Sequence, residues 1–172
     1  MTSKNTLQLE KPENTPVQHG PGPAHRILVV EDEPDIRRFT AQALLGSGYQ
    51  VDDAENGAVA WETLQLNNYD LLITDHNMPK LTGVELVKKL RSARMALPVI
   101  LATGKLPVEV LSQNPSLQLA AMLPKPFSFE ELLGTVKEVL LATARDREQA
   151  GPPADLPNVC GCNDFTPQLT VA

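Results

Sequence analysis

The sequence contains only two cysteines, Cys160 and Cys162, and a single residue separates them. Such a pair cannot build a disulfide framework, so we expect a fold that is stable without covalent cross-links. The two thiols also supply only half of the four ligands that a structural zinc site needs. Free thiols are therefore the simpler interpretation.

Long hydrophobic runs and an excess of positive charge are also absent. No apolar run approaches the roughly 18 residues that span a bilayer, and the polar N-terminal segment does not resemble a secretory signal. We therefore expect a cytoplasmic protein without membrane contact. With 15 Lys and Arg against 21 Asp and Glu, the formal net charge is -6. Because such a chain is repelled by nucleic-acid phosphates, we expect no direct DNA binding.

Proline and glycine crowd the two ends of the chain and indicate flexible tails over residues 1–25 and 149–172. Neither tail resembles a helix-turn-helix or a catalytic module. The 172 residues leave room for one ordinary domain. We expect that domain at residues 26–148.

Within this domain, apolar runs of strand length alternate with segments of helical period. Continuous apolar runs are typical of strands buried on both faces of a parallel sheet. Helical periodicity and capping residues predict four helices, the last of which begins with a capping box formed by Ser128 and Glu131. Pro115 interrupts the segment in which a fifth helix is expected. The pattern predicts an α/β fold with a doubly wound, five-stranded parallel sheet. The expected strands are 27–30, 49–54, 71–74, 98–102 and 120–123; the expected helices are 34–46, 57–66, one through 84–90, one within 108–118, and 129–140.

Polar side chains follow four of the five apolar runs. In a parallel α/β sheet, ligands bind outside the carboxyl ends of the strands, so these side chains should converge on one edge. They are Glu31 and Asp32 after the first run, Asp75 after the third, Thr103 after the fourth and Lys125 after the fifth.

Three neighbouring carboxylates repel one another unless a cation joins them, and Mg²⁺ prefers hard oxygen ligands. A phosphoryl group at this edge would have its charge neutralised by the metal and by Lys125, while Thr103 could donate a hydrogen bond. Asp75 stands at a central strand end and is the expected nucleophile. The constellation therefore predicts phosphoryl transfer onto a carboxylate.

Taken singly, each of these residues has a simpler explanation. Glu31 and Asp32 could be an acidic helix start favoured by the helix dipole, and Asp75 could belong to an ordinary turn. Thr103 could lie in a plain loop, and Lys125 could be a solvated charge. Their joint placement at successive strand ends favours a functional site.

Three motifs make the chain resemble the receiver domain of bacterial two-component response regulators. Segment 27–34 (ILVVEDEP) resembles the acidic-pair motif of that family. Segment 75–79 (DHNMP), followed by Gly83, resembles its phospho-acceptor loop, and segment 125–127 (KPF) resembles its lysine motif. The resemblance covers 26–143 and implies the flavodoxin-like receiver fold.

The resemblance also implies roles for individual residues. Asp75 would be the phospho-acceptor, Thr103 the switch hydroxyl and Lys125 the contact of the acyl phosphate. Glu31 and Asp32 would bind Mg²⁺, together with Asp75 and the backbone carbonyl of Asn77. A cis peptide bond is expected between Lys125 and Pro126.

The resemblance implies a single-domain response regulator that takes a phosphoryl group from a phosphohistidine on a sensor histidine kinase or a histidine phosphotransfer protein. It would lose the group slowly, would turn over no separate substrate and would signal by protein contact. No oligomeric state is assigned. The sequence departs from the family at Met122, where an aromatic residue usually lies three positions before the lysine, and in segment 106–119, where Pro107 and Pro115 interrupt a regular helix.

Two other classes of function are compatible with parts of the pattern. A phosphatase of the haloacid-dehalogenase type also uses Asp, Thr or Ser, Lys and Mg²⁺, but it would carry a second Asp two positions after its nucleophile, where this chain has Asn77. A receiver-like binding module that works without phosphorylation would have no need of the complete acidic and lysine set.

Overall fold

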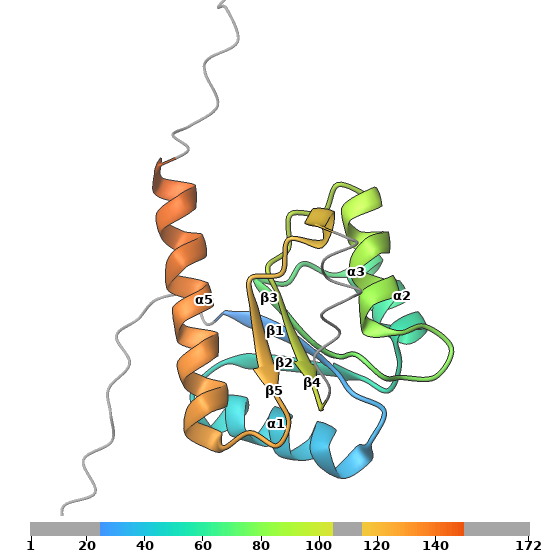
Figure 1. The fold of residues 1–172 in the computed structure, drawn as a ribbon. Coiled ribbons are helices and arrows are strands. Elements are labelled where there is room, and N and C mark those ends of the chain that lie inside the picture. The colour runs from blue at the N-terminus through green and yellow to red at the C-terminus, as the bar shows by residue number, and fades with distance from the viewer. Residues whose placement is uncertain (1–24, 105–114, 150–172) are drawn as a thin grey trace, which may run out of the picture.

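Five parallel strands form one sheet in the order β2-β1-β3-β4-β5 (Figure 1). The computed structural model describes residues 25–104 and 115–149. Each predicted strand is confirmed to within one residue at each end, and so is the doubly wound topology. The strands are β1 (Arg26–Val30), β2 (Gln50–Ala54), β3 (Leu71–Asp75), β4 (Val99–Thr103) and β5 (Ala121–Pro124).

The inner strands are mostly hydrophobic because helices cover both faces of the sheet. β3 and β4 are buried at every position, whereas the edge strands β2 and β5 each contain two exposed residues and only one buried residue. A strand covered on both faces has no side chain that can point into water, so its sequence is a continuous apolar run. This difference explains why the apolar signals at 49–54 and 120–123 are the weaker ones.

Among the described residues, two helices pack on each face. α1 (Pro34–Gly46) and α5 (Phe129–Gln149) cover one face, and α2 (Gly57–Leu66) and α3 (Gly83–Ser92) cover the other (Figure 1). Successive β1 residues serve opposite cores: Ile27 packs with the α1 and α5 side chains, and Leu28 packs with those of α2 and α3. This alternation follows from the two-residue period of a strand.

Side-chain caps define where several helices begin. The predicted capping box at the start of α5 is confirmed, because the Glu131 N–H donates to Ser128 Oγ at 3.2 Å and the Ser128 N–H donates to Glu131 Oε2 at 2.7 Å. Thr82 and Glu85 form the same box at the start of α3. These caps satisfy N–H groups that have no partner within the helix.

The expected helix within 108–118 falls mostly outside the described residues. Only a 3₁₀ helix, η1 (Pro115–Leu117), is seen from that segment. Cys160, Cys162 and most of both predicted tails also lie outside the described residues, so the domain boundaries 26 and 148 stay a prediction. Within the described ranges 25–104 and 115–149, no helix is long and apolar enough to cross a membrane.

Candidate functional site

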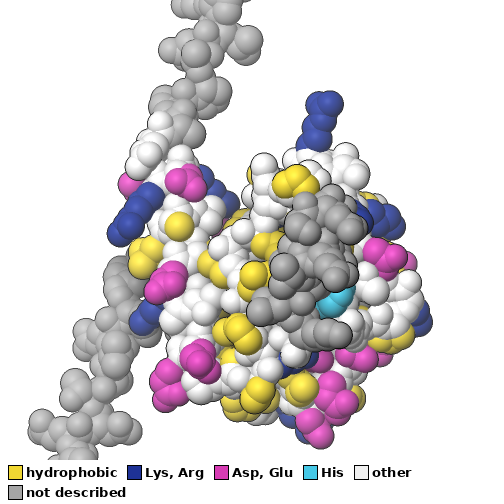
Figure 2. All heavy atoms as spheres, in the orientation of Figure 1, with side chains coloured by type: hydrophobic (Ala, Val, Ile, Leu, Met, Phe, Trp, Pro, Cys, Tyr) yellow, Lys and Arg dark blue, Asp and Glu magenta, His cyan; other side chains and the backbone are white. Residues whose placement is uncertain are grey.

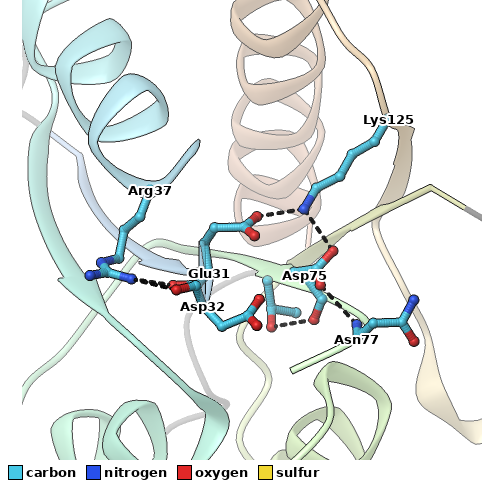
Figure 3. Close-up of polar contacts among 7 residues, drawn as sticks. Glu31, Asp32, Arg37, Asp75, Asn77 and Lys125 are labelled. Carbon is cyan, nitrogen blue, oxygen red and sulfur yellow. Dashed lines mark hydrogen bonds and ion pairs between the residues drawn. The ribbon is translucent and has the colours of Figure 1, made fainter. Parts of the chain in front are cut away.

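The acidic residues predicted from separate parts of the chain meet at one edge of the sheet (Figure 3). Glu31 and Asp32 follow β1, and Asp75 is the last residue of β3. β1 and β3 are neighbours, with Val30 opposite Thr74, so the three carboxylates emerge side by side. One carboxylate oxygen of each residue lies within 4.8 Å of those of the others.

Lys125, the first residue after β5, joins two of these carboxylates. Its Nζ lies 2.6 Å from Glu31 Oε2 and 2.8 Å from Asp75 Oδ1 (Figure 3). The predicted cis peptide bond between Lys125 and Pro126 is confirmed. The ammonium group therefore lies between two acidic groups at the carboxyl ends of different strands.

The electrostatics of this group follow from its burial. Glu31 and Asp75 are only 5% and 6% exposed. Burial raises the pKa of Glu31, and the hydrogen bond and charge of Lys125 offset part of this effect. Burial acts to lower the pKa of Lys125, but its hydrogen bonds to Asp75 and Glu31 outweigh burial, and the pKa is raised. Lys125 is therefore a firmly protonated cation.

Backbone groups orient the Asp75 carboxylate. The Asn77 N–H donates to Asp75 Oδ2 at 2.8 Å, while Asp75 Oδ1 faces Lys125. The hydroxyl of Thr74, which is fully buried, donates to the Asp75 carbonyl oxygen at 3.0 Å. Each carboxylate oxygen of Asp75 is thus held by a donor of its own.

Gly83 shows why the acceptor loop needs a glycine where α3 begins. A Cβ atom at this position would overlap the backbone carbonyl oxygen of Asp75 and would lie 3.2 Å from Thr74 Oγ1. The Gly83 N–H also donates to the His76 carbonyl oxygen at 3.1 Å. The end of β3 and the start of α3 are therefore in direct backbone contact, which a side chain would prevent.

Thr103 ends β4 and is 1% exposed. In the strand register Asp75 is opposite Ala102, and Thr103 is opposite Pro124. The Lys125 N–H donates to the Thr103 carbonyl oxygen at 2.9 Å. All five residues predicted to converge therefore lie at the same edge of the sheet.

Three other side chains differ in how far they are exposed. His76, directly after Asp75, is partly buried, and its Nδ1 has no hydrogen-bond partner among the described residues. Met122 lies on β5 and is 41% exposed. Phe39 of α1 is half exposed and lines a groove beside Lys125 and Phe127.

Sequence reasoning missed Arg37, which contacts the backbone of the acidic pair. Its Nη1 donates to the Glu31 carbonyl oxygen at 2.6 Å and lies 3.3 Å from that of Asp32. The available signal was a cation in the first turn of the helix that follows two acidic residues. Because such a residue also reads as an ordinary exposed charge, the pattern alone did not single it out.

The donor set fits a divalent cation that prefers oxygen. Three carboxylates within 4.8 Å offer hard oxygen ligands, while no sulfur or imidazole donor belongs to this cluster. Such a set suits Mg²⁺ better than a thiolate-preferring or imidazole-preferring metal. The acidic cluster can therefore bind a metal ion of the Mg²⁺ class.

The family model for the response regulator receiver domain matches residues 27–137, and the chain belongs to this family. It is 36% identical over 117 residues to the response regulator receiver protein CpdR of Brucella abortus, covering 68% of this chain and 98% of CpdR. It is 34% identical over 115 residues to the transcriptional regulatory protein CusR of Escherichia coli, covering 67% of this chain and 51% of CusR. The chain thus spans about half the length of CusR.

Solved receiver structures share the fold. The chemotaxis response regulator CheY4 of Vibrio cholerae superimposes with a TM-score of 0.62 at 32% identity, covering 67% of this chain and 98% of that one. TrrA of Thermotoga maritima gives 0.61 at 35% identity with the same coverage, and that structure is a complex with Mg²⁺-BeF. The chain is a receiver domain of two-component response regulators.

Proposed function

We propose that this chain is a response regulator whose Asp75 accepts a phosphoryl group from a phosphohistidine of a sensor histidine kinase or a histidine phosphotransfer protein. The observation that carries the proposal is the contact of Lys125 with both Glu31 and Asp75 beside the exposed Asp32. Acceptor, acidic pair and cation are thus assembled in one place. Residues 26–148 would form the receiver domain of a cytoplasmic protein.

The residues that would hold Mg²⁺ are Glu31, Asp32, Asp75 and the backbone carbonyl of Asn77. When bound, the ion would neutralise charge on the acidic group and on the phosphoryl oxygens. The Mg²⁺-BeF complex of the related TrrA supports this choice of metal.

Side chains of this chain would carry out the phosphoryl transfer itself. A carboxylate oxygen of Asp75 attacks phosphorus, a new P–O bond forms, and the P–N bond to the donor histidine breaks, leaving its electron pair on nitrogen. Lys125 stays protonated and stabilises negative charge on the phosphoryl oxygens. The Thr103 hydroxyl, at the end of β4, would donate to another of these oxygens.

Water then hydrolyses the acyl phosphate, which releases inorganic phosphate and restores the Asp75 carboxylate. The chain would therefore turn over no substrate other than its phosphodonor. Output would follow from protein contact, because phosphorylation biases a two-state equilibrium of the loops after β3 and β4. Figure 2 shows hydrophobic side chains exposed over β5 and α5, and Met122 and Phe129 are 41% and 42% exposed. This surface supports a role in protein contact.

Intact-protein mass after incubation with acetyl phosphate and Mg²⁺ tests the proposal. The wild type should gain one phosphoryl group, about 80 Da. The gain should require Mg²⁺ and be lost in Asp75→Asn. Asp146→Asn, an exposed carboxylate on α5, is the matched control and should retain it.

A gain that persists in Asp75→Asn would show that the acceptor is wrong. No gain in the wild type, under conditions that modify a control receiver, would instead favour a phosphorylation-independent binding module. In that case Asp75→Asn should leave partner binding unchanged.

A further inference from the structure

Arg37 reaches from the first turn of α1 back to the loop that carries the acidic pair. Its Nη1 donates to the Glu31 carbonyl oxygen at 2.6 Å and to the Asp32 carbonyl oxygen at 3.3 Å. Figure 3 shows the guanidinium on the side of this loop that faces away from Asp75 and Lys125. Arg37 therefore holds the backbone of both acidic residues without contacting their carboxylates.

The guanidinium is itself held by a second strand. Arg37 Nε donates to Asp53 Oδ2 at 2.9 Å, and Asp53 lies on β2 opposite Val29 of β1. The Glu31 N–H donates to the Ala54 carbonyl oxygen at 3.1 Å. The backbone of Glu31 is thus tied to β2 twice. Its N–H binds β2 directly, and its carbonyl group is linked to β2 through Arg37.

These contacts suit a rigid arrangement. The Arg37 side chain is only 18% exposed, although the Asp53 side chain is 55% exposed. A guanidinium presents several N–H donors in a fixed planar fork, so one group can bind two carbonyls and a carboxylate with little freedom. Rotation of the Glu31 or Asp32 peptide, which would turn a carboxylate away from Asp75, would break at least one of these bonds.

We propose that Arg37 is a positioning residue for the metal site, which fixes the Glu31–Asp32 backbone so that both carboxylates face Asp75. This inference rests on the proposed binding of Mg²⁺. Arg37 would touch neither the metal nor the phosphoryl group. Partners that orient metal ligands commonly change metal affinity by about 10-fold to 100-fold when they are removed.

The sign of the effect separates positioning from simple charge. A nearby cation repels Mg²⁺, so if only the charge of Arg37 mattered, its removal would tighten Mg²⁺ binding. If Arg37 acts by orienting the ligands, its removal weakens binding. The two explanations therefore make opposite predictions for the same variant.

The test is Mg²⁺ titration of the full chain by isothermal calorimetry. Arg37→Ala should bind Mg²⁺ roughly tenfold more weakly than the wild type. Arg37→Lys keeps the charge but loses the fork, so it should also remain weaker than the wild type. Arg38→Ala removes an exposed cation from the adjacent position and should bind as the wild type does.

Urea unfolding of each variant in EDTA, followed by circular dichroism, measures the structural effect separately. If Arg37→Ala does not fold, Asp53→Ala removes only the exposed anchor and should also weaken Mg²⁺ binding relative to the wild type. Unchanged or tighter binding by a folded Arg37→Ala, or by Asp53→Ala in its place, would overturn the inference. So would an equal loss in Arg38→Ala.

The wild-type titration distinguishes this inference from the proposed function. A wild type that binds Mg²⁺ and gains the phosphoryl group, beside an Arg37→Ala variant of equal affinity, would overturn only the role of Arg37. A wild type that binds no Mg²⁺ would overturn both.

Discussion

Lys125 Nζ lies 2.6 Å from Glu31 Oε2, although 94 residues separate the two in the sequence. The contact joins the loop after β1 to the residue that follows the edge strand β5, and the same ammonium group also reaches Asp75 across the sheet. Two buried carboxylates therefore share one cation. The stability of the metal-free site therefore depends on this shared positive charge.

Replacing Lys125 with Met should destabilise the metal-free protein. The variant leaves the buried carboxylates of Glu31 and Asp75 without their cation, and we expect a loss of about 2 kcal/mol in the free energy of unfolding. Mg²⁺ should recover part of this loss, because a bound cation again offsets the acidic charge. Urea unfolding with EDTA and with Mg²⁺ measures both effects.

Lys137→Met is the matched control for this prediction. Lys137 is exposed on α5, so its loss should change stability by less than about 0.5 kcal/mol. Equal stability of Lys125→Met and the wild type in EDTA would contradict the role assigned to Lys125.

Glu31→Gln should remove a pH dependence from the stability of the metal-free protein. Burial raises the pKa of Glu31 above its ordinary value of 4.5, so the folded state holds this proton more tightly than the unfolded state does. The stability that Glu31 contributes is therefore fully present below about pH 4.5 and is lost as the pH rises through its folded pKa. The neutral amide cannot titrate.

The measurement is the difference in unfolding free energy between Glu31→Gln and the wild type, from urea titrations in EDTA between pH 4 and pH 8. This difference should move in favour of the variant as the pH rises. A difference that stays constant over the whole range would contradict the raised pKa.

Two glycine substitutions should have opposite effects. Gly83→Ala places a Cβ against the Asp75 carbonyl oxygen and should cost about 2 kcal/mol, because backbone must move to make room. Gly134→Ala lies within α5, where a Cβ meets nothing within 4 Å, and should stabilise the protein by about 1 kcal/mol.

Thermal and urea unfolding of the two glycine variants provides the comparison. We also expect Gly83→Ala to slow phosphorylation by acetyl phosphate, since the displaced backbone belongs to the acceptor. A Gly83→Ala variant as stable and as reactive as the wild type would show that the loop accommodates the methyl group.

Arg91 should stabilise the end of the domain opposite the site. Its guanidinium donates to the carbonyl oxygens of Leu117, Met95, Leu97 and Gln118 at 2.9 to 3.1 Å, which ties α3 to the segment before β5. Lysine cannot reproduce this fork, so Arg91→Lys should lose about 1 to 2 kcal/mol of unfolding free energy.

Arg94→Lys is the control for Arg91→Lys. Arg94 is exposed and close in sequence, and the change keeps its charge, so its unfolding midpoint in urea should match that of the wild type. An unchanged midpoint in Arg91→Lys would mean that these four hydrogen bonds add little to stability.

The strand ends, to within one residue, and the starts of α1, α2 and α5 could be predicted because they depend on local physics. The end of α5 was not predicted, because the helix continues to Gln149, past the expected end at residue 140. Continuous apolar runs identified β3 and β4, and the Ser128–Glu131 box located the start of α5. The strand ends then placed Glu31, Asp75 and Lys125 at one edge through the general geometry of parallel sheets. The edge strands were harder to recognise, because half of their residues face water.

The sequence by itself determined, to within one residue, where each strand ends and which chemical groups lie there. Only the tertiary structure decided that Lys125 contacts Glu31 and Asp75, that Gly83 touches the Asp75 backbone, and that Arg37 holds the acidic loop. Periodicity and capping act within about one helical turn or a few strand residues, so a short window of sequence reveals them. Contacts between distant segments depend on strand order, register and exact side-chain placement, which are set by packing of the whole domain.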